Sequence, residues 1–144
     1  MTIKDIQDEI VDEFSMFDDW MERYEYIIEL GKSLPLIQEQ YKTEDNLIKG
    51  CQSKVWLQGD FNSDNIVFTA DSDAVLTKGI IAILIRVFSN QKPGAILEAN
   101  TEFINQIGLK EHLSPTRANG LVSMIKNIKM YAFAYETKTN NGRI

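Results

Sequence analysis

A nearly continuous apolar run from residue 74 to residue 88 constrains the fold of this chain more than any other feature. Only Thr77, Lys78 and Arg86 interrupt it, so a helix over these residues is apolar on most of its surface. The run falls short of the roughly 18 apolar residues that suggest a membrane span. It predicts a buried helix on which the other elements pack. Gly79 lies inside it, and because Gly disfavours helix, we expect a neighbouring backbone to approach closely there.

Two runs before this helix have the pattern of β-strands. In Val55–Asp60, Val55 and Leu57 share one face and Trp56 takes the other, and Ile66–Ala70 is rich in β-branched and aromatic residues. The residues between these runs favour a turn, which predicts a hairpin. Leu47–Lys49 adds a short third strand, so we expect a three-stranded antiparallel sheet.

Helical periodicity flanks the predicted sheet on both sides. Two amphipathic helices open the chain: the first is capped by Thr2 with Asp5, and the second is capped by Ser15 with Asp18 and ends at Gly31. Ser72 or Asp73 caps the buried helix. Further helical segments are predicted from Pro35 to Gln40, from Pro93, from Thr101 to Ile107, and from Ser114–Pro115 through Tyr135.

These elements define an α+β fold in which a small three-stranded antiparallel sheet packs against helices and is flanked by them. The 144 residues suit one domain, with a core over about residues 17–136. The polar residues 137–144 are expected to form a flexible tail.

Composition excludes several classes of function. A net charge of −6 argues against general nucleic-acid binding. One cysteine and one histidine are too few for a soft metal site or for a cluster built on the protein itself, and a dithiol mechanism is impossible, so we expect no metal and no cofactor. The N-terminus lacks the apolar core of a signal peptide, which favours a cytoplasmic protein without a membrane anchor.

The single cysteine lies in the stretch Gly50–Trp56, directly before the first predicted strand. Gly50 permits backbone angles closed to other residues, so Cys51 is expected at the tip of a turn that can move. Lys49 and Lys54 bracket the thiol, and nearby cations favour the thiolate, which is the nucleophilic form. A lone cysteine is also commonly a small, inert, buried residue, and the pattern of residues alone does not separate the two interpretations.

Several motifs resemble one known family. The segment GCQSKVWL follows Trp20, Arg23-Tyr24 and Leu30-Gly31-Lys32, and it precedes DSDAVLTKG and LSPTRANGL. In this order and spacing, from about Trp20 to about Lys129, the motifs resemble the SufE family. The resemblance implies a SufE-like fold and a carrier without catalytic activity of its own, in which Cys51 accepts sulfane sulfur as a persulfide.

The resemblance also implies partners for this chain. The sulfur donor would be a PLP-dependent cysteine desulfurase (SufS-like), stimulated by the transfer, with PLP on the donor only. The recipient would be an iron–sulfur scaffold complex (SufBCD-like), and the carrier would be a monomer or a homodimer. Gly50, Gln52 and Ser53 would support Cys51 in the turn, and Asp73 and Arg117 match charged positions of the DSDA and SPTR segments.

Residue chemistry leaves the supporting roles open. Gln52 and Ser53 either hydrogen-bond the sulfur or close the turn. An Asp such as Asp73 complements a helix dipole without any further role, whereas Arg117 opposes the dipole in a first turn and so requires a partner. His112 is placed in a loop with no identified partner.

Three alternatives to a carrier for cluster assembly stay open. One is a carrier for a parallel desulfurase system that feeds RNA or cofactor modification. Another is a one-cysteine thiol enzyme, which would require a base or oxyanion site close to the sulfur. The last is a structural domain with an inert cysteine.

Overall fold

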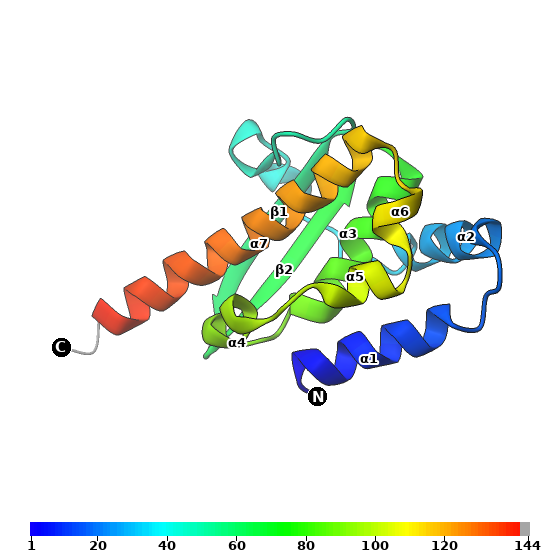
Figure 1. The fold of residues 1–144 in the computed structure, drawn as a ribbon. Helices are drawn as coiled ribbons and strands as arrows, with labels where there is room; N and C mark the ends of the chain where they lie inside the picture. Colours follow the sequence, from blue (N-terminus) through cyan, green and yellow to red (C-terminus); the bar gives the residue numbers. More distant parts are fainter. Residues whose placement is uncertain (142–144) are drawn as a thin grey trace.

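The computed structural model describes residues 1–141 and contains a β-hairpin with helices packed on its buried face (Figure 1). Strands β1 (Val55–Asn62) and β2 (Asn65–Ser72) pair antiparallel with Val55 opposite Ser72. Val55 and Leu57 are buried and Trp56 is half-buried, as the alternation predicted. Ser63, with a φ of 60°, forms part of the tight turn between the strands.

The predicted third strand is wrong. Leu47 forms only an isolated antiparallel bridge to Trp56, with one backbone bond of 2.8 Å from Ile48 N–H to the Val55 carbonyl. The described sheet has two strands. Gly50, with a φ of 91°, turns the chain away after this contact, so pairing cannot extend.

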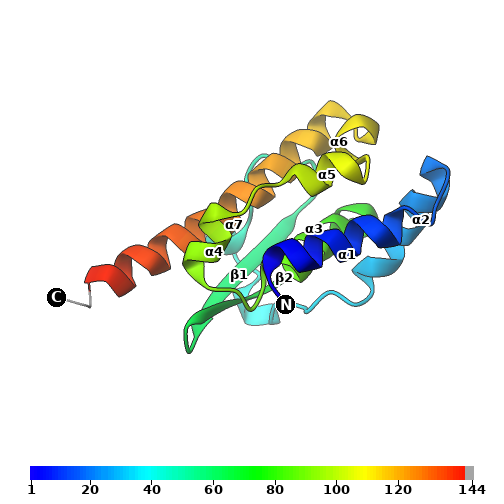
Figure 2. The same ribbon diagram turned by 60° about the horizontal axis from the view of Figure 1, so that its bottom comes forward.

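Helix α3 (Val75–Phe88) is the buried central helix, as predicted. It packs between the hairpin and the N-terminal helices α1 (Ile3–Phe14) and α2 (Trp20–Gly31), which lie on its far side in Figure 2. The close approach expected at Gly79 is present, since a Cβ atom there would lie 2.1 Å from the Ile27 carbonyl oxygen. Only a glycine lets α2 and α3 cross at this separation.

A polar cluster ties α1 to the other helices. The carboxylate of Glu13 accepts hydrogen bonds from the Arg86 guanidinium and from the Tyr26 hydroxyl. The Arg86 guanidinium is the main cause that lowers the pKa of Glu13, and burial together with the Glu13 carboxylate raises the pKa of Tyr26 to about 12. The cluster is charged and fully paired, so it can lie against the core without an unpaired buried charge.

Helix α7 (Pro115–Asn141) crosses the hairpin and extends beyond the body of the molecule (Figure 1). Tyr131 and Tyr135 donate hydrogen bonds to the carbonyls of Leu57 and Gly59 on β1. The helix starts as predicted, because the Arg117 N–H bonds the Ser114 hydroxyl and Pro115 is the first helical residue. Its end was predicted too early, since residues 137–141 are helical, and residues 142–144 of the expected tail lie outside the described part of the chain.

Short helices complete the chain, and some predicted boundaries were wrong. The N-cap of α2 is Asp19, which accepts from the Glu22 N–H, instead of Ser15 or Asp18. His112 ends a short helix instead of lying in a loop. The remaining segments are η1 (Glu39–Tyr41), η2 (Glu44–Asn46), α4 (Pro93–Glu98), α5 (Glu102–Gln106) and α6 (Leu109–His112).

Candidate functional site

Cys51 lies at the tip of the turn before β1, as the sequence predicted, and rests on the beginning of α7. Its thiol is half-buried and donates a hydrogen bond to the Gly120 carbonyl oxygen, with Sγ and oxygen 3.7 Å apart. A Cβ atom on Gly120 would lie 3.4 Å from the sulfur, so the turn packs directly on the helix backbone. The thiol therefore lies against the backbone of α7 at residue 120, where a Cβ atom would still make an ordinary contact with it.

A second contact fixes the other side of the turn. Gly50 has a φ of 91°, and a Cβ atom there would lie 2.8 Å from the Ser123 hydroxyl oxygen. Gly50 is thus required both by its backbone angle and by its contact with α7. The same angle excludes proline, whose ring fixes φ near −65°, so a proline at residue 50 would disrupt the turn instead of only stiffening it.

Asp73 holds the turn where it joins the hairpin. Its carboxylate accepts the Lys54 N–H at 3.0 Å, and the Asp73 N–H bonds the Lys54 carbonyl at 3.2 Å. The Ser72 hydroxyl donates to the same carbonyl at 2.8 Å. The predicted capping role of Ser72 or Asp73 is therefore wrong: Ala74 is the N-cap of α3, without a side-chain cap bond, and Asp73 closes the cysteine turn instead.

A small cavity adjoins the thiol. Its volume is about 10 Å³, which suits roughly one water-sized atom. The walls come from the turn, from α3 and from α7, three segments that are distant in the sequence. They are formed by Cys51, Gln52, Ser53, Thr77, Ile80, Arg117, Gly120 and Met124.

The predicted supporting residues thus meet at Cys51 in different ways. Gln52 and Ser53 line the cavity beside the sulfur, and Arg117 reaches it from the first turn of α7. Arg117 is exposed and forms no ion pair with any residue in the part of the chain that the structure describes. The partner that its position requires is not a carboxylate among residues 1–141.

Burial controls the ionisation of the thiol. Loss of solvent around Cys51 raises its pKa, so the protonated thiol is favoured. The expected effect of Lys49 and Lys54 is therefore wrong for this conformation, because both side chains are exposed and burial outweighs them. The sulfur is thus half-buried, and its burial favours the protonated form.

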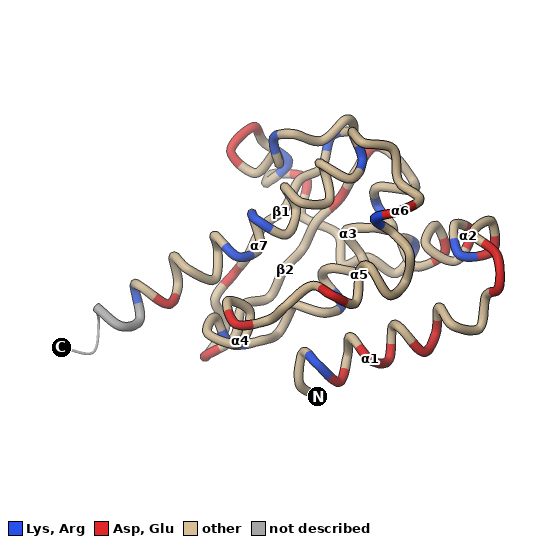
Figure 3. The backbone as a smooth tube through the Cα atoms, viewed as in Figure 1, with Lys and Arg blue, Asp and Glu red and all other residues tan. Residues whose placement is uncertain are grey.

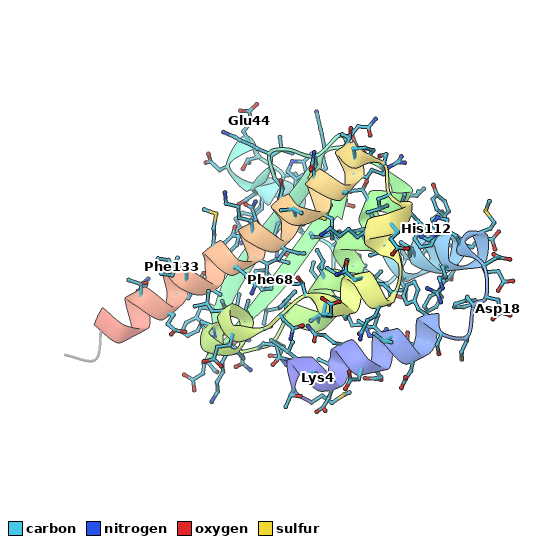
Figure 4. The ribbon with its side chains drawn as sticks, viewed as in Figure 1. Lys4, Asp18, Glu44, Phe68, His112 and Phe133 are labelled. Atoms are coloured by element: carbon cyan, nitrogen blue, oxygen red, sulfur yellow. The ribbon has the colours of Figure 1, made fainter. Side chains whose placement is uncertain are left out.

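His112 belongs to a different part of the molecule. Its ring stacks on Trp20 with centroids 4.3 Å apart, and Nδ1 lies 2.9 Å from the Gly108 carbonyl oxygen. Figure 4 shows it beside α2, with its neighbours supplied by α2 and α6. His112 does not line the cavity beside Cys51, so the imidazole does not supply the base that a thiol enzyme would require there.

The sequence interpretation did not assign four wall residues to the site, namely Thr77, Ile80, Gly120 and Met124. A glycine inside a helix is unfavourable, and this signal was available at residue 120 as it was at residue 79. Thr77 was visible as a polar interruption of the buried helix. Within residues 1–141 no group of three metal-ligating side chains is gathered, and no described helix is long and apolar enough to cross a membrane.

The geometry agrees with the comparisons to known proteins. The family model of SufE, described as an Fe-S metabolism associated domain, matches residues 8–132. An uncharacterized SufE-like protein of Rhizobium meliloti (strain 1021) is 42% identical over 130 residues, which cover 87% of this chain and 93% of that protein. SufE-like protein 1 of Arabidopsis thaliana, described as chloroplastic/mitochondrial, is 38% identical over 90% of this chain but only 35% of its own length.

A solved structure supports the fold independently. The solution structure of a hypothetical protein from Thermus thermophilus superposes with a TM-score of 0.76. It covers 92% of this chain and 96% of that chain at 18% sequence identity. This similarity concerns the arrangement of helices and hairpin alone.

Proposed function

Because the chain belongs to the SufE family, we propose that it is a sulfur carrier for iron–sulfur metabolism, which accepts sulfane sulfur on Cys51 from a cysteine desulfurase. One observation carries the proposal: the only thiol of the protein lies at the tip of a turn, half-buried over a cavity for a single atom. An inert core cysteine would be enclosed by regular elements. Here the sulfur is sheltered by an irregular turn that packs on α7.

The transfer itself needs no redox partner. The Cys51 thiolate attacks the outer sulfur of the donor persulfide, and a new S–S bond forms on Cys51 as the donor S–S bond breaks. The donor cysteine leaves as a thiolate and takes up the proton that Cys51 releases. Sulfur is passed on at the same oxidation level, and one thiol is sufficient.

Burial raises the pKa of Cys51, so opening of the turn favours deprotonation of the thiol. Opening exchanges the weak contact with the Gly120 carbonyl for solvent or for the partner. Gly50 supplies a backbone hinge on one side, and the Asp73 to Lys54 bonds keep the other side attached to β1. A docked donor that opens the turn thus exposes the Cys51 thiol and at the same time favours the thiolate, which is its reactive form.

The partners follow from this role. PLP chemistry belongs to the desulfurase, which is relieved of its persulfide each time Cys51 accepts a sulfur. The loaded carrier delivers sulfur to an iron–sulfur scaffold complex, and after transfer the cavity beside Cys51 offers the added sulfur a place away from solvent. The cytoplasm is the expected site of action.

Mass spectrometry tests the proposal directly. The protein is incubated with a PLP-dependent cysteine desulfurase and cysteine, and the intact mass of the carrier is measured. We expect one added sulfur on the wild type and none on Cys51→Ser, which preserves the volume of the side chain but cannot form a persulfide. Sulfur on the serine variant, or none on the wild type, contradicts the assignment.

A further inference from the structure

Charge is distributed unevenly along the chain. Residues 1–32, which contain α1 and α2, carry ten acidic and three basic residues, a net charge of −7. Residues 33–144 carry eleven acidic and twelve basic residues, a net charge of +1. Figure 3, which colours the backbone by residue type, shows acidic residues in series along α1 and α2, away from the beginning of α7. The protein is therefore acidic overall but strongly polarised.

Four cations surround the cysteine turn. Lys49 and Lys54 flank it in the chain, and Arg117 lines the cavity of Cys51. Lys126 lines, together with Lys49 and Ser123, a groove of about 440 Å³. We call Lys49, Lys54, Arg117 and Lys126 the cationic face. All four are exposed, and among the described residues none forms an ion pair.

Several other lysines of the chain are neutralised locally. Lys4 pairs with Asp8, Lys32 pairs with Glu29, and Lys42 pairs with Glu39 and Asp71. The cations gathered around Cys51 differ from these lysines, because their charge is left uncompensated by any contact within residues 1–141.

Three carboxylates lie near the cationic face but do not neutralise it through contact. Asp73 is engaged with the backbone of Lys54. Glu44 and Asp45 line the same groove as Lys49 and Lys126 without an ion pair to either lysine, and Figure 4 shows Glu44 at the outer edge of the molecule, directed away from the body. Unpaired cations on an acidic protein are favourable where a partner brings the opposite charge.

We propose that the partner that reaches Cys51 presents an acidic surface around its own reactive group, and that the polarised charge of this chain orients the encounter. The inference rests on the proposed sulfur transfer and adds the chemistry of the docking surface. The acidic helices α1 and α2 repel such a surface, and the cationic face attracts it. The two proteins therefore meet preferentially in the orientation in which Cys51 faces the partner. Steering of this kind raises association rates and weakens with ionic strength.

The test measures the second-order rate of persulfide formation on Cys51 with a cysteine desulfurase and cysteine. Raising NaCl from about 50 mM to about 300 mM should lower this rate by about tenfold, as expected for steered association. Lys126→Glu should lower the rate at low salt by about threefold or more and should approach the wild type at high salt. Lys92→Glu is the matched control, because Lys92 is an exposed lysine at the start of α4, outside the cationic face and without an ion pair among residues 1–141.

Two further measurements separate the possible outcomes. Loading of the isolated protein by sodium polysulfide should be equal in wild type, Lys126→Glu and Lys92→Glu, which shows that the thiol chemistry is intact. The double variant Glu22→Gln, Glu25→Gln should change the rate less than Lys126→Glu, although it alters the net charge by the same two units. If the rate of persulfide formation does not depend on salt, or if Lys126→Glu and Lys92→Glu lower it equally, the proposal of an acidic partner surface is wrong while the proposed function stands. If no persulfide forms on Cys51 of the wild type, both the proposed function and the docking proposal are wrong.

Discussion

Cys51 and Gly120 are separated by 69 residues in the chain, yet the thiol of one donates to the carbonyl oxygen of the other at 3.7 Å. This contact places the sulfur against the backbone of α7, beside the small cavity that side chains of α3 and α7 complete. The state of the thiol therefore depends on how well the turn stays on the helix, and the predictions below perturb that arrangement from different sides.

Gly50→Ala should destabilise the protein by about 1–2 kcal/mol, because alanine is strained at a positive φ and its Cβ atom would lie 2.8 Å from the Ser123 hydroxyl oxygen. Urea unfolding measures the loss. Gly94→Ala is the matched control, since no positive φ applies there and the new Cβ atom meets only the flexible end of Glu136. Adding Ser123→Gly to Gly50→Ala should recover part of the loss; no recovery would show that the contact with Ser123 is unimportant.

Gly79→Ala and Gly120→Ala should have opposite effects, although both glycines lie inside helices. Each substitution gains up to about 1 kcal/mol in helix propensity. At residue 79 the new Cβ atom would lie 2.1 Å from the Ile27 carbonyl oxygen, so we expect a net loss of about 3 kcal/mol or more. At residue 120 the nearest atom is the Cys51 sulfur at 3.4 Å, an ordinary contact, so stability should be kept or increased. Thermal unfolding of both variants decides this, and equal effects would contradict the described packing.

Asp73→Ala should loosen the cysteine turn. It removes the acceptor of the Lys54 N–H, a hydrogen bond that stabilises by about 0.5–1.5 kcal/mol. Alkylation of Cys51 by iodoacetamide in the native protein should become several-fold faster, as expected when opening costs about 1 kcal/mol less. Asp73→Asn retains a side-chain oxygen and is expected to behave like the wild type. If both variants react at the rate of the wild type, the carboxylate does not hold the turn closed.

Stability should depend on the ionisation of Cys51 at alkaline pH. Burial raises the pKa of the folded thiol above that of the unfolded chain, so the unfolded state loses its proton first as the pH rises. The contribution of this group to stability is complete below the unfolded pKa, near 8.5, and is lost as the pH rises through the folded pKa. The difference between the urea midpoints of wild type and Cys51→Ser should therefore shift against the wild type between pH 7 and pH 10. A constant difference would show that the thiol is not shielded.

Local patterns predicted most of the architecture. The apolar run before Phe88 identified the central helix, the alternation around Trp56 identified the hairpin, and Ser114 with Pro115 marked the start of α7. The missed third strand depended on one residue, because the positive φ of Gly50 limits Leu47 to a single bridge. A short apolar run does not reveal in advance how far its pairing extends.

The roles around the sulfur were less predictable, since they depend on contacts between distant segments. Asp73 has the position of a helix cap in the sequence, but in the fold its carboxylate accepts a hydrogen bond from the Lys54 N–H and none from the N-terminus of α3. Lys49 and Lys54 are close to Cys51 in the sequence, yet the shift in the pKa of the thiol comes from its burial. For Gly120 the sequence indicated only that a glycine is unfavourable inside a helix. Its contact with the Cys51 thiol could not be predicted, because it depends on the turn folding back onto α7.

The burial of Cys51 against α7 also protects the protein against forming a disulfide bond with a second copy of itself. A disulfide between two copies forms when the Cys51 thiolate of one copy attacks the inner sulfur of the persulfide on another and hydrosulfide leaves as the S–S bond of the persulfide breaks. Both turns must be open at that encounter, so the rate falls with the square of the open fraction. Transfer from a dedicated donor requires only one turn to open, and the donor itself can promote that opening. If the turn is open for about one part in a hundred of the time, the self-reaction is slowed by about ten thousandfold and chance attack by a small oxidant by only about a hundredfold. Partial burial of the Cys51 sulfur therefore slows disulfide formation between two copies more than any other reaction of the thiol, and that is the reaction that would inactivate two carriers at once.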